Sequence, residues 1–482
     1  MFEAPQITPF NFHPNDQKPL GNTHPSLYQA IFIEDQKEAG EKMKFGYKSE
    51  TSAVFVGAAT FAACFFIPRR FLALTIPLWL VASRLLARGA MNHARPVTDA
   101  DTADKQAQAR FVMSHDMPLA KRPVAIVTGT NSGIGYWTAV GLAVEGYEVV
   151  VTCRSAVLTQ QTAERIRQEA VRRRLAQPQR YAHSPKSVLV EGHLPVECDD
   201  FDSVREFAGW VGKKYAQRNV QVLVNNAGGM RKAQAFSRFH PNLELHTAMN
   251  FLGPLLLTEL LLPVLERNGG RVVYVSSEAH RFAQSLLLPG RFKVWRSLTA
   301  FPTCNGLISG KLLNALKDAN QGPGKSSGPL QNPSIQHAFG RYGVSKLLNT
   351  YHAHMIARRY RDVKDEAHRV YACSLHPGCV ATKFSRDIIG TFLGIIFSWA
   401  SLLLLKTSEE GAQTTLHCAM CPREELELVS PSGEKPTTSA DAVSPYFVEC
   451  ADQTTSMLRA YGWDVSEAAA ICQWARQQVG LT

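Results

Sequence analysis

Side chains able to do chemistry stand in two short motifs in the second half of the chain. Tyr342 and Lys346 are four positions apart in YGVSK, so on a helix they lie on one face about one turn apart. A nearby ammonium favours the phenolate, so we expect Lys346 to lower the pKa of Tyr342 toward the range useful for proton transfer. The strand end VSS at 275–277 adds Ser277, whose hydroxyl suits a hydrogen bond to a carbonyl or carbinol oxygen. These residue types indicate proton transfer at an oxygen bonded to carbon.

A glycine-rich turn, TGTNSGIG at 128–135, has the spacing of a phosphate-binding loop. It follows an apolar strand and precedes a helix, so its backbone N–H groups can approach a pyrophosphate at the helix N-terminus. The next strand ends at Cys153-Arg154-Ser155, where an NAD site would place a carboxylate for the ribose 2′-hydroxyl. A guanidinium and hydroxyls suit a 2′-phosphate instead, so we expect NADP(H); the alternative is that Arg154 is a solvated surface charge.

The stretches between these motifs alternate between short apolar strands and helices. This alternation is typical of a parallel sheet built from right-handed βαβ units and covered on both faces. The sequence therefore predicts an α/β fold, a Rossmann-type doubly wound parallel sheet, and an exposed loop at the Gly-, Ser- and Pro-rich stretch 317–334. The predicted strands are 124–128, 148–152, 188–191, 221–224, 271–275 and 370–375.

The segment 53–83 is the most apolar of the chain and is interrupted by Pro68-Arg69-Arg70. Each half is shorter than the roughly 20 residues of a spanning helix, and arginines at the bilayer centre are costly. A membrane-associated hairpin or interfacial anchor fits best; a single tilted span and a buried helical pair are the alternatives. We expect no cleavable signal peptide. The predicted organisation is a polar leader at 1–52, a membrane-anchor segment at 53–90, a linker at 91–122 and the α/β domain at 123–482, with an insertion at about 281–338.

A second apolar run, IIGTFLGIIFSWASLLLL at 388–405, is long enough for a membrane span. It leads into KTSEEGAQT, however, and a span here would separate the last strand from the sheet. We therefore expect an apolar helix at the substrate entrance that dips into the membrane interface. Plain core packing is the alternative.

Charge and cysteine content narrow the partners and the compartment. Lys+Arg 52 against Asp+Glu 41 gives +11 without a basic run or an aromatic platform, so we expect no nucleic-acid partner. An anionic membrane surface or a phosphorylated cofactor accounts for the excess. The ten cysteines are scattered, which favours a reducing compartment. Cys418 and Cys421 form a CxxC without a second pair, so we expect buried cysteines on a helix and no metal site.

Taken together, the motifs resemble the short-chain dehydrogenase/reductase family over about residues 123–480, within the retinol dehydrogenase-like branch. The motifs are TGTNSGIG, CRS, NNAG, VVYVSSEAH, YGVSK, LHPGCVAT and KTSEEGAQT. In that family Tyr is the general acid/base, Lys lowers its pKa and binds the nicotinamide ribose, Ser binds the substrate oxygen and Asn helps hold a proton-relay water. The resemblance thus implies a catalytic set of Asn250, Ser277, Tyr342 and Lys346, with Ser276 as the alternative serine.

The resemblance also implies a dinucleotide site, with two departures. The stretch around Glu197, the candidate for an acidic residue that touches adenine, is lengthened. Ser277 and Tyr342 are 65 positions apart, more than is usual, because the insertion lies where substrate-pocket walls and dimer-helix ends are found. The implied cofactor-binding residues are Gly129, Asn131, Ser132, Gly133, Ile134, Gly135, Arg154, Asn226, Ala227, Gly228, Tyr342, Lys346, Pro377, Gly378, Val380 and Thr382.

The resemblance and the apolar runs imply a membrane-associated, NADP(H)-dependent enzyme that interconverts a lipophilic alcohol and its aldehyde or ketone. Retinoid-, steroid- or lipid-like substrates are the expected class. The alternative is an NADP(H)-binding membrane scaffold with little turnover, against which the intact Asn-Ser-Tyr-Lys set argues. We expect a cytosol-facing protein of the endoplasmic reticulum or the lipid droplet. Many members of the family form dimers, so a homodimer is the expected oligomer, although the insertion leaves this state open.

Overall fold

The structure is a computed structural model that describes residues 116–182, 184–231, 233–281, 283, 311–325, 330, 335–380, 406–430, 442–455, 457 and 464–481. The apolar segments 53–83 and 388–405, on which the membrane predictions depend, lie outside these residues, as does Thr382.

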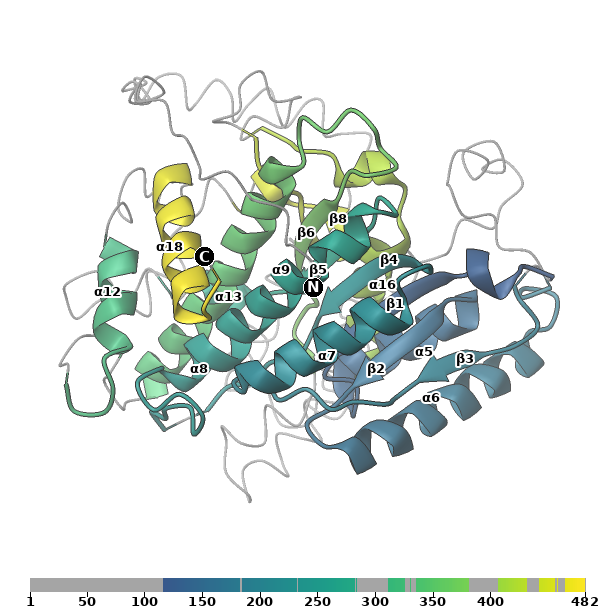
Figure 1. Ribbon diagram of the computed structural model, residues 1–482, viewed down its shortest axis with the longest axis horizontal. Coiled ribbons are helices and arrows are strands. Elements are labelled where there is room, and N and C mark those ends of the chain that lie inside the picture. The colour runs from purple at the N-terminus through teal and green to yellow at the C-terminus, as the bar shows by residue number, and fades with distance from the viewer. Residues whose placement is uncertain are drawn as a thin grey trace, which may run out of the picture. The chain divides into compact units, whose positions relative to one another are not determined.

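A single mostly parallel sheet runs through the described part of the chain (Figure 1). Its strand order is β3-β2-β1-β4-β5-β6-β7-β8, and only the β7–β8 pair is antiparallel. The chain winds outward from β1 in one direction and then from β4 in the other, so the ends of β1 and β4 form the crevice where such sheets bind ligands. The Rossmann-type prediction is confirmed. The strands are β1 (Pro123–Thr128), β2 (Glu148–Thr152), β3 (Leu189–Glu191), β4 (Asn219–Asn225), β5 (Arg271–Val275), β6 (Tyr371–His376), β7 (Tyr446–Val448) and β8 (Ala451–Asp452).

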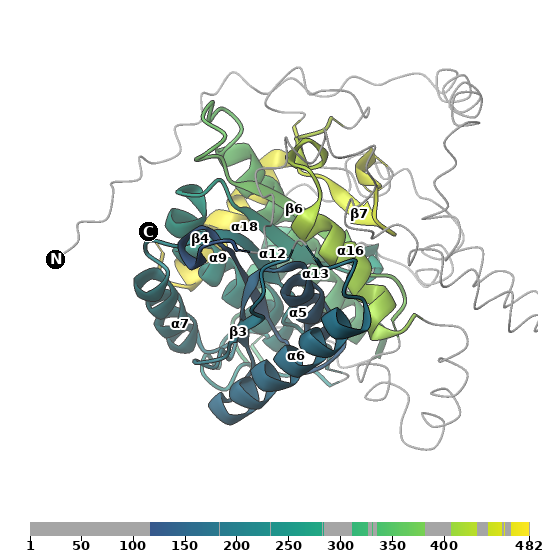
Figure 2. The same cartoon turned by 90° about the vertical axis from the view of Figure 1, so that its right-hand side faces the viewer.

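Helices cover both faces of the sheet (Figures 1 and 2), which is why β1, β2 and β6 are buried along their whole length. One layer consists of α5 (Gly133–Glu145), α6 (Ala156–Ala176) and α16 (Ser408–Met420). The opposite layer consists of α7 (Phe201–Lys214), α9 (Gly253–Glu266) and α13 (Ile335–Arg359). Against α13 packs α18 (Val465–Gln478), and against α18 packs α12 (Lys311–Ala319).

One described helical stretch, Leu245–Glu266, has the length and composition of a membrane span. It comprises α8 (Leu245–Thr247), the π-helical turn η5 (Ala248–Leu252) and α9. Its most apolar window is 78% buried inside the fold. The stretch is therefore accounted for as the central core helix of the α/β domain.

The predicted exposed loop at 317–334 is partly wrong. Its first residues belong to α12, whose apolar face buries Leu312, Leu316 and Ala319. Leu330 is also buried, in the same core as α9 and α13. The Gly, Ser and Pro residues of this stretch masked an amphipathic helix directly before it.

Gly253, the first residue of α9, provides a test of how closely the helical layer is packed. A Cβ at this position would lie 1.9 Å from the carbonyl oxygen of Cys198. Gly253→Ala therefore forces a backbone shift, and we expect it to lower the free energy of unfolding by about 1–3 kcal/mol. Gly209→Ala, on α7 with nothing within 4 Å, is the control and should raise it by about 0.5–1 kcal/mol. Denaturant titration measures both; equal effects would contradict this packing.

Candidate active site

The hydroxyls of Ser277 and Tyr342 meet at the end of β5. Tyr342 lies on α13, and its phenol is hydrogen-bonded to the Ser277 side chain. Ser276 turns the other way: its hydroxyl is buried and donates to the Lys346 carbonyl over 2.8 Å. Of the two serines, Ser277 therefore faces the tyrosine, and Ser276 fastens strand β5 to α13.

The close approach of α13 to the strand end depends on Gly343, the residue after the tyrosine. A Cβ there would lie 2.1 Å from the carbonyl oxygen of Ala279, in the turn η6 (Glu278–Arg281) that follows the serines. Ala279 N–H in turn donates to the Ser277 hydroxyl over 3.2 Å. A glycine next to Tyr342 thus lets the phenol reach the serine.

Lys346 lies one turn beyond Tyr342 on the same helix and is buried. Its ammonium nitrogen donates to the carbonyl of Val275 over 2.8 Å and lies 5.7 Å from the centroid of the Tyr342 ring. Burial lowers the pKa of Lys346 to about 8. Lys346 therefore loses its charge near pH 8, where an exposed lysine is still protonated.

The expected lowering of the Tyr342 pKa is not what the structure shows. Burial raises the pKa of Tyr342 to about 12, and the hydrogen bond from Ser277 offsets only part of that rise. Desolvation of the phenolate prevails because the Lys346 ammonium is directed at the Val275 carbonyl rather than at the phenol oxygen. At neutral pH the phenol is thus a proton donor.

Asn250 stands in the π-helical turn η5, where the helix locally widens. Its side chain donates to the Gly229 carbonyl and accepts from the Gly229 N–H, both over 2.9 Å. It also donates to the Ser345 hydroxyl over 3.0 Å, and that hydroxyl donates to the Tyr342 carbonyl over 2.7 Å. The asparagine thus links the loop after β4 to the helix that carries tyrosine and lysine.

The predicted phosphate turn has the backbone that such a loop requires. Gly129 and Gly133 have φ angles of +68° and +69°, the left-handed region that favours glycine. A Cβ on Gly135 would lie 2.3 Å from the Asn226 side-chain nitrogen, so only glycine lets α5 approach β4. Asn131 and Ser132 complete the turn; Ser132 is the N-cap of α5 and makes no capping hydrogen bond with its side chain.

Thr128, the last residue of β1, is a site residue that sequence reasoning missed. Its hydroxyl accepts hydrogen bonds from the backbone N–H groups of Asn226 and Ala227, over 3.1 and 3.0 Å. The Asn226 side chain donates to the Thr128 carbonyl over 2.8 Å. In the sequence, its position as the first residue of the glycine-rich turn 128–135 could have indicated this role. These bonds hold the ends of β1 and β4 together along the crevice.

The crevice is lined at its deep end by Gly228. A Cβ there would lie 3.1 Å from Asn250 Oδ1 and 3.2 Å from Lys346 Nζ. A side chain would occupy the space between the glycine turn and these two polar groups. Gly228 leaves this space free of a side chain, and the N-terminus of α5 has no side-chain cap. Both features fit a dinucleotide whose pyrophosphate lies at 129–135.

The residues predicted for the adenosine end lie near one another. Arg154 is exposed just after β2, and Glu197 is partly buried and follows Val196, whose N–H donates to the Cys153 carbonyl over 2.8 Å. Burial, with a neighbouring carboxylate at Asp199, raises the pKa of Glu197, and the positive charges of Arg154 and Arg238 oppose that rise. Arg238 also forms an ion pair with Glu197 at 3.6 Å.

The predicted nicotinamide loop begins at Pro377, directly after β6. Gly378 has a φ of +88°, and Val380 forms an isolated parallel bridge with Lys406. Lys406 makes a buried ion pair with Glu449. A Cβ on Gly411 would lie 2.4 Å from the Val380 side chain and 3.4 Å from that of Ile134, so this loop lies near the start of α5.

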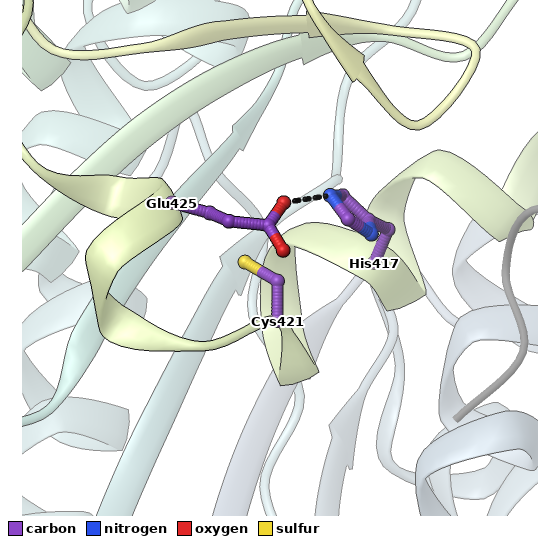
Figure 3. A group of neighbouring side chains, drawn as sticks. All are labelled: His417, Cys421 and Glu425. Carbon is purple, nitrogen blue, oxygen red and sulfur yellow. Dashed lines mark ion pairs between the residues drawn. The ribbon is translucent and has the colours of Figure 1, made fainter. Parts of the chain in front are cut away.

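A cluster of three metal-ligand types lies away from this site (Figure 3). His417 and Cys421 belong to the end of α16 and Glu425 to the turn η8 (Arg423–Leu426); their ligand atoms lie within 4.8 Å of one another. Arg271 donates to the Cys421 carbonyl over 2.7 Å and lies 3.8 Å from its sulfur, so it already places a positive charge there. Burial raises the pKa of Cys421 to about 12, which disfavours the thiolate that a metal needs. His417 Nε2 lies 3.1 Å from a carboxylate oxygen of Glu425 beside the end of α16.

Comparison with known proteins agrees with the geometry. Residues 123–287 match the short chain dehydrogenase family. Retinol dehydrogenase 11 of Homo sapiens is 29% identical over 309 residues, which are 64% of this chain and 75% of the relative. Retinol dehydrogenase 14 of Mus musculus is 27% identical over 310 residues, 64% of this chain and 76% of the relative. The chain is thus similar to the short-chain dehydrogenases over residues 123–287, and relatives that it matches over 64% of its length are retinol dehydrogenases.

Among solved structures, L-sorbose reductase from Gluconobacter frateurii, complexed with NADPH and L-sorbose, is 16% identical with a TM-score of 0.39, covering 64% of this chain and 92% of that one. The fold assignment depends on the strand order described above rather than on this match. These matches indicate an oxidoreductase of the short-chain dehydrogenase kind.

The lowered pKa of Lys346 predicts a loss of activity at alkaline pH. In carbonyl reduction the phenol of Tyr342 stays protonated until about pH 12, whereas Lys346 loses its proton as pH rises through about 8. We expect kcat/KM, which reports the free enzyme, to fall about tenfold per pH unit above that value. Lys213→Met, an exposed lysine on α7, is the control and should keep the wild-type profile. A profile that stays flat to pH 10 would contradict the assignment.

Proposed function

We propose that this protein is a membrane-associated, NADP(H)-dependent reductase and dehydrogenase that interconverts a lipophilic alcohol with its aldehyde or ketone. The observation that carries the proposal is the hydrogen bond between the Ser277 and Tyr342 hydroxyls, with the buried Lys346 one turn away. Two hydroxyls that meet at the mouth of a dinucleotide crevice form a cradle for one oxygen atom of a substrate.

Each side chain has a separate task in this scheme. The cofactor, when bound, delivers or accepts a hydride at the carbonyl carbon. Tyr342 donates its phenolic proton to the carbonyl oxygen in reduction and takes it back in oxidation, while the Ser277 hydroxyl hydrogen-bonds that oxygen. Lys346 holds a positive charge near the phenolate that forms. Asn250 keeps the loop after β4 in place and is the expected holder of a relay water.

The preference for NADP(H) over NAD(H) is proposed from the end of β2. Arg154 is exposed there, directly before Ser155, the N-cap of α6, and the strand end itself carries no carboxylate. A guanidinium binds a phosphate in bidentate fashion, and a helix N-terminus adds favourable backbone dipoles. Glu197, a carboxylate near Arg154, also forms an ion pair with Arg238 at 3.6 Å, so a second guanidinium offsets its negative charge.

The substrate class is proposed from the relatives and from the sequence. The curated relatives with the matches given above are named retinol dehydrogenases. The apolar segments 53–83 and 388–405 suit an enzyme that takes its substrate from a membrane. A retinoid-, steroid- or long-chain lipid-like alcohol or carbonyl compound is therefore the proposed substrate, at a cytosol-facing membrane such as the endoplasmic reticulum or the lipid-droplet surface.

Turnover by detergent-purified protein tests the proposal directly. NADPH absorbance is followed with a panel of retinoid, steroid and long-chain aldehydes and ketones, and with NADH in parallel. We expect oxidation of NADPH with at least one lipophilic carbonyl compound. Tyr342→Phe removes the transferable proton and should lower kcat by about 10²–10⁴-fold, with little change in NADPH binding.

Two results would count against this function. Tight NADPH binding without turnover on the whole panel would favour the scaffold alternative. Turnover that survives in Tyr342→Phe would remove the tyrosine from the chemistry. Ser276→Ala separates positioning from chemistry, because Ser276 donates to the backbone of α13; it should lower stability and reduce kcat less than Tyr342→Phe does.

Cofactor selectivity is tested at Arg154. In Arg154→Ser we expect KM for NADPH to rise on the order of tenfold or more, since one charge-assisted contact contributes about 1.5–3 kcal/mol. KM for NADH should change little. Arg172→Ser, an exposed arginine further along α6, is the control for net charge. Equal effects on both cofactors, or from both variants, would contradict a specific 2′-phosphate contact.

A further inference from the structure

A buried ionic cluster lies directly behind the catalytic tyrosine. It consists of Glu244, His246 and Arg341, each at most 2% exposed. Glu244 Oε1 lies 2.6 Å from His246 Nδ1 and 3.7 Å from Arg341 Nε. Its other oxygen accepts from the N–H of Thr247 over 2.9 Å. Removing one partner from such a group leaves a buried charge or donor unsatisfied, which is costly.

The cluster is joined to three parts of the active site. His246 Nε2 accepts from the backbone N–H of Arg231 over 2.9 Å, which fixes the neutral tautomer with its proton on Nδ1 toward Glu244. Arg231 belongs to the loop after β4, whose Gly229 is hydrogen-bonded to Asn250. The helical stretch that begins at Leu245 carries Asn250 itself. The His246 ring lies 6.5 Å from that of Tyr342 at 73°, an edge-to-face contact.

The described part of the insertion completes this cluster. Asn320, at the end of α12, accepts with Oδ1 from the backbone N–H of Glu244 over 2.8 Å and donates with Nδ2 to the Leu316 carbonyl over 2.7 Å. The Leu330 carbonyl accepts from Arg341 at 3.5 Å. Both contacts come from residues within the segment that separates Ser277 from Tyr342.

The other end of α12 is also fixed. The buried carboxylate of Glu467, on α18, accepts from the backbone N–H groups of Leu312 and Leu313 over 3.0 and 3.3 Å. A carboxylate at a helix N-terminus satisfies free N–H groups and matches the helix dipole. The helix of the insertion is thus held at both ends, by α18 and by the Glu244 cluster, and is oriented relative to the site.

We propose that the insertion is a working part of the active site: Asn320 and the Glu244 cluster act as positioning residues that hold Tyr342 and the Asn250 loop in their reactive arrangement. The inference rests on the proposed function, because its main effect is on turnover. Loss of the Asn320 acceptor releases the Glu244 N–H, and the motion passes through His246 to Arg231 and through Arg341 to its neighbour Tyr342. The phosphate turn at 129–135 makes none of these contacts, so cofactor binding should be weakened far less than turnover.

Asn320→Ala in the full-length protein tests this, with Asn314→Ala on the exposed face of the same helix as the matched control. We expect kcat to fall about tenfold or more in Asn320→Ala, since sub-ångström misplacement of reacting groups is enough for such a loss. The dissociation constant for NADPH, from cofactor fluorescence, should rise by a clearly smaller factor than that by which kcat falls. Asn314→Ala should match the wild type in both. A merely structural defect would instead lower the melting temperature without this split between kcat and binding.

Amide hydrogen exchange of peptides covering 228–231 and 244–250 provides a readout that does not require turnover. Exchange should quicken in Asn320→Ala and stay unchanged in Asn314→Ala. Wild-type kcat together with unchanged exchange in Asn320→Ala would overturn the inference while the proposed function stands. If the wild type itself has no turnover, the proposed function fails, and the exchange data alone decide whether the insertion orders these loops.

Discussion

The site depends on one constraint, the close seating of α13 against the end of β5. Two hydrogen bonds hold the helix against the strand. The Ser276 hydroxyl, after β5, donates to the backbone of α13, and the Lys346 ammonium, on α13, donates to the carbonyl of Val275, the last residue of β5. Gly343 removes the Cβ that would otherwise collide with the turn after the strand. Tyr342 faces Ser277 only because these contacts fix both the distance and the rotation of the helix.

This seating has an electrostatic consequence. Burial disfavours the charged form of both ionisable groups, so the pKa of Tyr342 rises to about 12 while that of Lys346 falls to about 8. The usual order, in which the phenol titrates slightly before the amine, is reversed. A protonated phenol beside a lysine that still carries charge at neutral pH is arranged for proton donation to a substrate oxygen. Burial of the site therefore fixes its geometry and also favours proton donation from Tyr342 to the substrate oxygen.

Much of this could be predicted from the sequence, because apolar strands and glycine turns follow directly from local patterns. The run VAIVT, predicted as a strand at 124–128, forms β1 and is extended by one residue to Pro123; it was recognisable because a buried parallel strand is apolar on both faces. The pKa of Tyr342 was predicted with the wrong sign, because the spacing YGVSK shows that a lysine is near but not where its ammonium points. Ser277 was chosen over Ser276 from the resemblance alone, because the sequence does not show which of two adjacent side chains faces Tyr342. Thr128 was missed because its role depends on a hydrogen bond from Asn226, which follows β4 and lies 98 positions away in the sequence.

The insertion shows why fold and site survive a long interruption between two reacting residues. The turn after β5 and the α13 segment that carries Tyr342 are in contact, so the intervening chain leaves and returns at nearly one place. The entropy of closing such a loop grows only with the logarithm of its length, so extra residues cost the native state little. What the insertion adds depends on where it is held. Its helix α12 is hydrogen-bonded to Glu467 at its start and to Glu244 at its end. Glu244 in turn contacts Arg341, the residue directly before Tyr342. A segment anchored there is in a position to change the rate of the chemistry without touching the substrate.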